Sequence, residues 1–429
     1  MSNGKNITCS FCGGEQGLES PIIAGMEGHI CPACVKLASQ VVHSWSKNRS
    51  KRQLPDKILK PHELKSKLDE YVVGQAFAKE TLAVALHNHF KRLTYDTNED
   101  MAISKVHNDV ELDKSNVLMV GPTGSGKTLL IRTLANLLNV PFVIADATSL
   151  TQAGYVGDDV ETVIARLLDA AEGNVALAEW GIVYIDEIDK LARKGESNYG
   201  VRDISGEGVQ QALLKMVEGA DIKLPNKGGG RNREGHEGIM INTQHILFIA
   251  GGAFAGIDEV INERANKGRS KLGFHAELEG AVEKEQDRES IVRSLTTDDL
   301  RTFGLIPEFI GRFHVLAMLN KPTVDDLVHI LTEPKNALTK QYQRLFAYDG
   351  VELEFTQAAL FSIAEKALER GTGARALRGV LETMLRPIMY ELPAREDVSR
   401  CVINEDFVNG TGSVEYIAGE KIQRQALGA

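Results

Sequence analysis

Residues 121–128 have the types and spacing of a phosphate-binding loop. The segment reads GPTGSGKT and matches the pattern G-x-x-x-x-G-K-[ST]. In such a loop, backbone N–H groups and the positive end of the next helix surround phosphate oxygens. The lysine reaches the β- and γ-phosphates, and the threonine hydroxyl holds Mg²⁺. The candidate nucleotide-binding residues here are Gly121, Pro122, Thr123, Gly124, Ser125, Gly126, Lys127, Thr128 and Leu129, with Lys127 also a candidate catalytic residue.

The stretches on both sides of this loop support the prediction. Residues 117–120 are apolar and β-prone, and residues 129–138 have helical periodicity. The alternative is a glycine turn before an ordinary helix. A strand, the complete loop and a helix in this order favour phosphate binding over that alternative.

A second chemical motif is an acidic pair after an apolar run. Residues 181–187 read GIVYIDE, which predicts a buried strand of a parallel sheet that ends in Asp186 and Glu187. Asp186 is placed to hold the Mg²⁺ shell, and Glu187 is placed to polarise an attacking water. Two acids after a strand could be surface charge, but their combination with the loop favours nucleotide hydrolysis.

Four cysteines form a separate candidate metal site. Cys9, Cys12, Cys31 and Cys34 follow the spacing C-x2-C-x18-C-x2-C. Two such knuckles converge four thiolates on one tetrahedral Zn²⁺ and leave no open position, so the zinc would be structural. A pair of disulfides is the competing interpretation, which a reducing compartment disfavours. His29 is expected to be a surface side chain, because the four sulfurs complete the ligand set.

Composition limits the class of protein. The chain has 429 residues, a hydrophobic content of 43% and a charged content of 25%, as in soluble globular proteins. Its net charge of −10 argues against bulk capture of nucleic acid. We see neither a signal peptide nor a run of 18 apolar residues, and therefore expect a cytoplasmic protein with no membrane segment.

The order of the motifs predicts an α/β protein with two attached parts. We expect a large domain with a parallel sheet and helices on both faces, followed by a mainly helical lid. The predicted divisions are 1–48 for the zinc module, 49–62 for a linker, 63–319 for the large domain, 320–424 for the lid and 425–429 for a frayed tail.

Periodicity predicts the main elements of these domains. A helix should bury Leu82, Leu86, Phe90 and Leu93. Further strands are expected at 142–145, 245–250 and 351–355, and lid helices at 323–346, 356–370 and 374–391. Cys401 lies in an apolar run and is expected in a core.

Two short segments allow more than one interpretation. Residues 154–157 read GYVG, which fits either a mobile tip with a gripping side chain or a tight turn with a buried tyrosine. Residues 272–274 read LGF and lie between basic and acidic stretches. They could insert into a partner protein or belong to a small separate hydrophobic core.

Taken together, these residues resemble the AAA+ superfamily and, more closely, the ClpX family of ATP-dependent unfoldases that feed the ClpP peptidase. The resemblance extends from about Cys9 to Tyr416. Besides the four-cysteine module joined to an ATPase, its most specific segments are 154–157 (GYVG), 205–214 (SGEGVQQALL), 307–312 (PEFIGR) and 372–375 (TGAR). The related HslU unfoldases lack the zinc module.

This resemblance implies roles at the nucleotide site. Val72 and Val73 would flank the adenine of ATP. Arg312 would be a catalytic arginine finger that reaches a neighbouring subunit's site. Arg375 would be the lid residue that contacts the nucleotide of its own subunit.

The resemblance also implies partners. The chain would form a homohexamer in which Tyr155 and Val156 line the axial pore and grip protein substrates. Leu272, Gly273 and Phe274 would dock into a ClpP-type peptidase. The zinc module would dimerise and receive adaptors and some substrates.

Three segments depart from the family pattern. Leu272 replaces the usual Ile, a swap that keeps apolar volume. The pore-entrance loop has Arg231-Asn232-Arg233 in place of Arg-Lys-His, so substrate preference there does not carry over. The strand at 245–250 ends without the Asn or Thr sensor of many AAA+ motors.

Two other function classes compete with this one. A zinc-module AAA+ motor could act on nucleic acid, but the acidic charge and the lack of a basic stripe make a nucleic-acid partner unlikely. A non-enzymatic zinc scaffold is disfavoured because both nucleotide motifs are intact.

Overall fold

The computed structural model describes residues 8–14, 22–24, 28–39, 58–97, 112–151, 158–193, 206–224, 238–267 and 294–419. The chain divides into two units, Met1–Asp56 and Lys57–Ala429, and each is considered by itself. Among the described residues, none of the helices combines the length and the apolar character that crossing a membrane requires.

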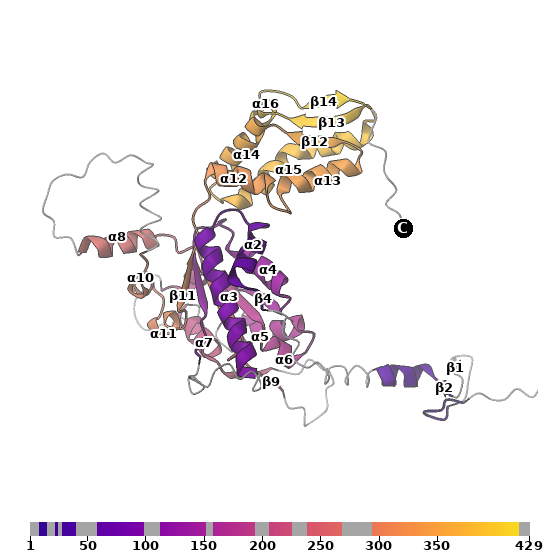
Figure 1. Cartoon of the computed structure of the whole chain (residues 1–429), viewed down its shortest axis with the longest axis vertical. Coiled ribbons are helices and arrows are strands. Elements are labelled where there is room, and N and C mark those ends of the chain that lie inside the picture. The colour runs from indigo at the N-terminus through magenta and orange to yellow at the C-terminus, as the bar shows by residue number, and fades with distance from the viewer. Residues whose placement is uncertain are drawn as a thin grey trace, which may run out of the picture. The chain divides into compact units, whose positions relative to one another are not determined.

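The first unit contains a two-stranded antiparallel sheet and a helical segment (Figure 1). Strand β1 (Ile23–Ala24) pairs with β2 (His29–Ile30), and residues 32–39 are helical. The four cysteines lie in the segments that flank these elements or begin the helix. A sheet of this size buries little apolar surface, so the sulfur cluster is the feature that can hold the unit together.

A five-stranded parallel sheet forms the centre of the second unit. Its strands are β3 (Val117–Val120), β4 (Phe142–Asp146), β7 (Ile182–Asp186), β10 (Leu247–Gly252) and β11 (Val315–Met318). Their order is β11-β3-β10-β7-β4, and every pair is parallel. The strands are nearly continuous apolar runs because both faces of the sheet are covered. The predicted α/β class is confirmed.

Helices cover both faces of this sheet. The first group is α2 (Pro61–Asp69), α3 (Ala76–Thr97) and α4 (Lys127–Leu138). The second group is α5 (Val160–Ala170), α7 (Glu207–Glu218), α10 (Thr297–Phe303) and α11 (Pro307–Ile310). The connection from β3 to β4 runs in the opposite direction to the one from β4 to β7, so right-handed crossovers place α4 and α5 on opposite faces. Helix α3 lies across the sheet and packs against β11 (Figure 1).

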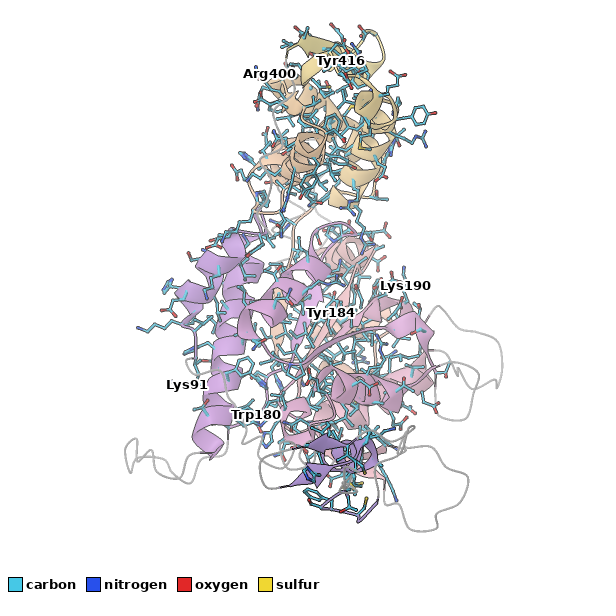
Figure 2. The ribbon with its side chains drawn as sticks, turned by 90° about the vertical axis from the view of Figure 1, so that its right-hand side faces the viewer. Lys91, Trp180, Tyr184, Lys190, Arg400 and Tyr416 are labelled. Atoms are coloured by element: carbon cyan, nitrogen blue, oxygen red, sulfur yellow. The ribbon has the colours of Figure 1, made fainter. Side chains whose placement is uncertain are left out.

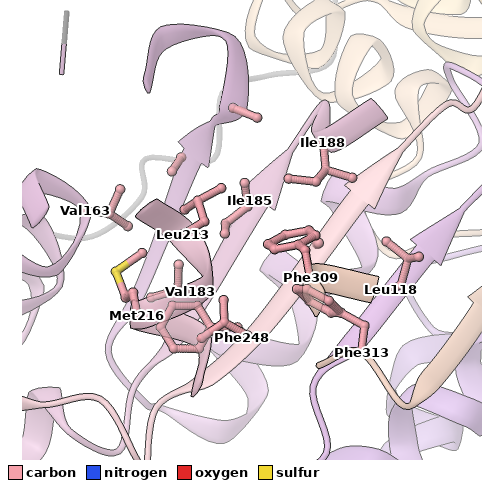
Figure 3. Close-up of a cluster of buried hydrophobic side chains, with 14 of the residues drawn as sticks. Leu118, Val163, Val183, Ile185, Ile188, Leu213, Met216, Phe248, Phe309 and Phe313 are labelled. Carbon is pink, nitrogen blue, oxygen red and sulfur yellow. The ribbon is translucent and has the colours of Figure 1, made fainter. Parts of the chain in front are cut away.

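The face covered by α5 and α7 carries the largest core cluster (Figure 3). Val183 and Ile185 alternate along β7 and point into it, where they meet Phe248 of β10 and Leu213 of α7. On α3, the four predicted core residues are all buried, which confirms the helical stripe. The sequence pattern therefore predicted which sides of these elements face the interior.

Several shorter elements connect this framework. They are η1 (Ala147–Ser149), β5 (Leu150–Thr151), β6 (Asp158–Asp159), α6 (Val175–Ala178), η2 (Ile188–Leu191) and α8 (Ile257–Lys267). Strands β8 (Asp221–Leu224) and β9 (Ile239–Asn242) form an antiparallel pair that was not expected from the sequence.

The C-terminal part of the second unit has its own core. Its elements are α12 (Val324–Thr332), α13 (Leu338–Tyr348), β12 (Glu352–Phe355), α14 (Gln357–Glu369), α15 (Ala374–Glu391), η3 (Leu392–Ala394), β13 (Val398–Ile403), α16 (Glu405–Asn409) and β14 (Glu415–Ala418). Strands β12, β13 and β14 form a three-stranded sheet beside the helices. Cys401 is fully buried in this core, as predicted, and burial raises the pKa of its thiol to about 11.

The prediction of one helix over 323–346 is wrong. The structure has two helices, α12 and α13, separated at residues 333–337. Pro334 lies in this break. Proline lacks the N–H that an α-helix interior requires, and its ring clashes with the carbonyl four residues earlier, so the helix cannot continue through residue 334.

A buried glutamine joins three segments of the large domain. Gln210 of α7 is 0% exposed. Its Nε2 donates to the Leu191 carbonyl at 2.7 Å, and its Oε1 accepts from the Ile306 N–H at 2.8 Å. Leu191 ends the turn that follows Asp186, and Ile306 precedes α11. One amide therefore ties the acidic end of β7 to the segment that leads to Arg312.

We expect Gln210→Ala to lower the free energy of unfolding by at least about 2 kcal/mol, because it leaves a buried N–H and a buried carbonyl without partners. Gln211 is its matched control. It lies next in the same helix but is exposed, and Gln211→Ala should change stability by less than about 0.5 kcal/mol. Chemical denaturation of both variants measures the difference. Equal stabilities would contradict a structural role for the Gln210 amide.

Candidate functional site

The nucleotide-binding motifs meet at the carboxyl edge of the parallel sheet. The 121–128 loop follows β3, and Asp186 is the last residue of β7. Strand β10 lies between these two strands and pairs with both. Because the strands are parallel, both motifs emerge at the same edge, which is where open α/β sheets bind ligands.

Lys127 is the first residue of α4 and is largely buried. Its Nζ donates to the carbonyl of Gly121 at 2.5 Å and to that of Pro122 at 3.0 Å. Burial lowers the pKa of this ammonium, because desolvation disfavours the charged form, while nearby Asp186 opposes that shift. The Lys127 ammonium is thus held against the backbone of the phosphate-binding loop.

The Asp186 carboxylate is fixed through both of its oxygens. Oδ2 accepts from the Thr128 hydroxyl at 2.8 Å. Oδ1 accepts from the Tyr184 hydroxyl at 3.1 Å and from the Glu187 N–H at 3.0 Å. The structure therefore brings Thr128 and Asp186 into direct contact, an arrangement in which both could hold one cation.

Glu187 differs from Asp186 in its surroundings. Its side chain is exposed, and its backbone has φ 58°, in the left-handed region that few residues other than glycine adopt. This turn directs the chain away from the strand direction directly after Asp186. The arrangement leaves the Glu187 carboxylate free of the sheet and on the rim of the cavity described next.

A cavity of about 970 Å³ lies at this edge and is lined from both parts of the second unit. The predicted residues in its lining are Thr123, Gly124, Gly126, Lys127, Thr128, Leu129, Asp186, Glu187 and Arg375. Arg375 comes from the start of α15, whereas the others come from the large domain. Cationic and acidic side chains face the same space, as a site for a phosphate chain with a metal ion requires.

The loop and the C-terminal helices touch directly at Gly124. This residue has φ +80°, and a Cβ there would lie 2.2 Å from the Thr372 carbonyl oxygen. The Ala374 N–H also donates to the Gly124 carbonyl at 3.4 Å. Only glycine fits this approach, so the phosphate-binding loop and the start of α15 are packed backbone against backbone.

A second, smaller cavity of about 210 Å³ adjoins the first. Its lining includes Val72 and Val73 as well as Ser125 of the loop. Beside it, the Gln75 side chain makes two hydrogen bonds of 2.9 Å with the backbone of Asn320, one as donor and one as acceptor. These bonds connect the segment that carries the two valines to the start of the C-terminal part.

Arg312 lies elsewhere in the described part of the chain. Its guanidinium forms a salt bridge with Glu218 of α7, and neither cavity has it in its lining. Its carbonyl accepts from the Asn116 Nδ2 at 3.0 Å. The structure thus separates Arg312 from the other candidate nucleotide residues of the same chain.

The four cysteines come together in the first unit. Their sulfur atoms all lie within 4.8 Å of one another. Backbone N–H groups, that of Cys12 first, lower the pKa of the Cys9 thiol to about 6. The pKa of Cys34 is raised to about 12 by hydrogen bonds with the sulfurs of Cys12 and Cys31. Four sulfurs this close match the tetrahedral donor set that Zn²⁺ prefers.

The predicted pore and docking residues lie outside the described residues. These are Tyr155, Val156, Leu272, Gly273 and Phe274, together with the altered loop at 231–236. Their roles stay predictions.

Sequence reasoning missed several residues that the structure brings to the site. Tyr184 contacts Asp186, and lid residues such as Pro334 and Gln341 line the large cavity. Tyr184 had one available signal, since it stands two residues before Asp186 and therefore on the same face of the strand. No sequence signal indicated that the lid residues line the cavity, because their position depends on how two separate cores pack.

Comparison with known proteins agrees with this geometry. Residues 112–316 match the family described as AAA domain (Cdc48 subfamily), residues 323–403 match the C-terminal D2-small domain of ClpB protein, and residues 7–44 match the ClpX C4-type zinc finger.

Two curated relatives are similar over nearly the whole chain. One, from Methylococcus capsulatus (strain ATCC 33009 / NCIMB 11132 / Bath), is the ATP-dependent Clp protease ATP-binding subunit ClpX 3. It is 52% identical over 420 residues, which cover 97% of this chain and 96% of the relative. The other, from Azotobacter vinelandii, is the ATP-dependent Clp protease ATP-binding subunit ClpX. It is 52% identical over 396 residues, 92% of this chain and 88% of the relative. With its AAA+ ATPase domain and C4 zinc module, the chain therefore belongs to the ClpX family of Clp protease ATP-binding subunits.

Proposed function

We propose that this chain is an ATP-dependent protein unfoldase and translocase. It would work as a homohexameric ring that threads tagged or adaptor-delivered proteins through its pore and feeds them to a ClpP-type peptidase. The observation that carries the proposal is the contact of Gly124 with Thr372 and Ala374. Because a phosphate-binding loop packs directly on the lid, a change at the phosphates would change the contact between the large domain and the lid.

The described residues suit ATP hydrolysis at this contact. Lys127 and the loop N–H groups would hold the phosphates, and Thr128 and Asp186 would hold Mg²⁺. When bound, Mg²⁺ neutralises charge on the phosphate oxygens. Glu187, exposed at the rim, would orient the attacking water, and Arg375 would contact the nucleotide from the lid.

Arg312 would complete the site of the next subunit in the ring. Its position away from both cavities of its own chain supports a role in trans. An arginine supplied to a phosphoryl-transfer site contributes roughly 10³- to 10⁵-fold in rate. A complete site would then need two adjacent subunits, which links hydrolysis to ring assembly.

The remaining parts of the chain would act on the protein substrate and bind its partners. Tyr155 and Val156 would grip the substrate chain in the pore, and an aromatic side chain tolerates any substrate sequence. Native domains are stable by only about 5–15 kcal/mol, so repeated pulls can unfold them. Residues 272–274 would dock on the peptidase. The zinc module would dimerise and receive adaptors, in a cytoplasm that keeps its thiols reduced.

Glu187→Gln should bind ATP with near-normal affinity but hydrolyse it at least about 100-fold more slowly, because the group that activates water is neutral. Glu365→Gln is the matched control, since Glu365 is exposed on α14. Nucleotide binding and steady-state phosphate release measure the two effects separately. Unchanged turnover would remove Glu187 from this role.

Tyr155→Ala should keep ATP hydrolysis but lose degradation of a tagged, folded reporter. The assay contains ATP and is run with and without a ClpP-type peptidase. Tyr155→Phe is the control, because it keeps an aromatic ring and should keep unfolding activity. If the alanine variant unfolds the reporter at the wild-type rate, the pore assignment fails. If the wild type hydrolyses ATP but never unfolds a protein, the proposed function fails.

Cys34→Ser should lower the zinc content from one ion per chain toward none, because one of the four thiolates is lost. Cys401→Ser changes a cysteine outside the cluster and should leave the zinc content unchanged. Elemental analysis of the purified proteins measures the ratio. Full zinc occupancy in the Cys34 variant would contradict the assignment of this ligand.

A further inference from the structure

We propose that Tyr184 is a positioning residue for the metal-binding carboxylate. Its hydroxyl holds Asp186 so that Oδ2 stays turned toward Thr128, in the orientation needed to bind Mg²⁺. This inference rests on the proposed function, which assigns Asp186 and Thr128 to Mg²⁺. It adds a role for a residue that is not itself a metal ligand and that stands two residues before the acidic pair.

The strand geometry places the two side chains together. Tyr184 and Asp186 are two residues apart on β7, so both project from the same face of the sheet. The hydroxyl donates to Asp186 Oδ1 at 3.1 Å. Tyr184 is 0% exposed and lies in the interior of the large domain (Figure 2). A buried tyrosine needs a partner for its hydroxyl, and here that partner is Asp186.

The two oxygens of Asp186 have different donors. Oδ1 accepts from Tyr184 and from the Glu187 N–H, whereas Oδ2 accepts from Thr128. Donors on both oxygens restrict rotation of the carboxylate about its Cβ–Cγ bond. Without the hydroxyl, Oδ1 would keep only the Glu187 N–H, and that N–H belongs to a residue with φ 58°. Tyr184 is thus the donor to Oδ1 that lies within the regular strand.

The neighbouring strand leaves room for the tyrosine. A Cβ on Gly251 of β10 would lie 2.1 Å from the Tyr184 hydroxyl oxygen and 2.8 Å from its ring carbon Cζ. In the strand register Ala250 pairs with Ile185, so Gly251 comes opposite the end of β7. A larger residue at 251 and a phenol at 184 cannot occupy the same space. Strand β10 thus ends without an Asn or Thr side chain, and the Tyr184 hydroxyl of β7 occupies the adjacent space as a polar group of the site.

The test is Tyr184→Phe in the full-length, assembled protein, which removes the hydroxyl and keeps the ring. We expect the Mg²⁺ concentration for half-maximal ATP hydrolysis to rise by about tenfold, as for loss of other groups that orient metal ligands. Nucleotide affinity measured in EDTA should not change, because Asp186 acts through the metal. Tyr342→Phe is the matched control, since Tyr342 is a buried tyrosine of the other core, and it should keep the wild-type Mg²⁺ requirement.

Two outcomes would overturn the inference. One is an unchanged Mg²⁺ requirement in Tyr184→Phe. The other is an equal loss of nucleotide affinity with and without Mg²⁺, which would indicate general damage to the site. No protein client is present in this assay. A wild type that hydrolyses ATP but threads no protein would therefore reject the proposed function and leave this inference intact.

Discussion

The hydrogen bond between the Thr128 hydroxyl and Asp186 joins two motifs that are 58 residues apart. It forms only because β3 and β7 both pair with β10 in a fixed parallel register. A shift of one residue in either pair would turn alternate side chains to the other face of the sheet. The apolar core around Val183, Ile185 and Phe248 opposes that shift, because it would remove these side chains from the cluster in which they pack. The core thereby sets the geometry of the site.

The same edge of the sheet is also where the two cores of the second unit meet. Gly124 contacts the backbone at the start of α15, and Gln75 is hydrogen-bonded to Asn320. One contact involves the phosphate-binding loop, and the other lies at the start of the C-terminal part. Under the proposed function, a movement of the loop on hydrolysis would act on the lid close to the point where the lid is connected to the large domain.

Much of this arrangement could be predicted from the sequence because its signals are local. The loop at 121–128, the β7 strand and the α3 stripe each depend on neighbouring residues. Pro334 was a local signal as well, but the apolar periodicity around it favoured one long helix. The antiparallel pair of β8 and β9 depends on pairing between distant segments. The spacing of Tyr184 and Asp186 indicates that both lie on one face of the strand, but it does not indicate their hydrogen bond, because the space beside Gly251 that holds the phenol exists only in the folded sheet.

The two ends of Arg312 are held very differently. Its backbone carbonyl is anchored by the buried Asn116 side chain, whose Oδ1 also accepts from the Phe248 N–H of β10. Its guanidinium faces solvent and rests against Glu218, a partially exposed pairing of the kind that contributes little to stability. The main chain of Arg312 is thus fixed, whereas its guanidinium is held by an exposed salt bridge. In the proposed ring, such an arginine would exchange the Glu218 carboxylate for the more highly charged phosphates of a neighbouring subunit's site without any rearrangement of the main chain.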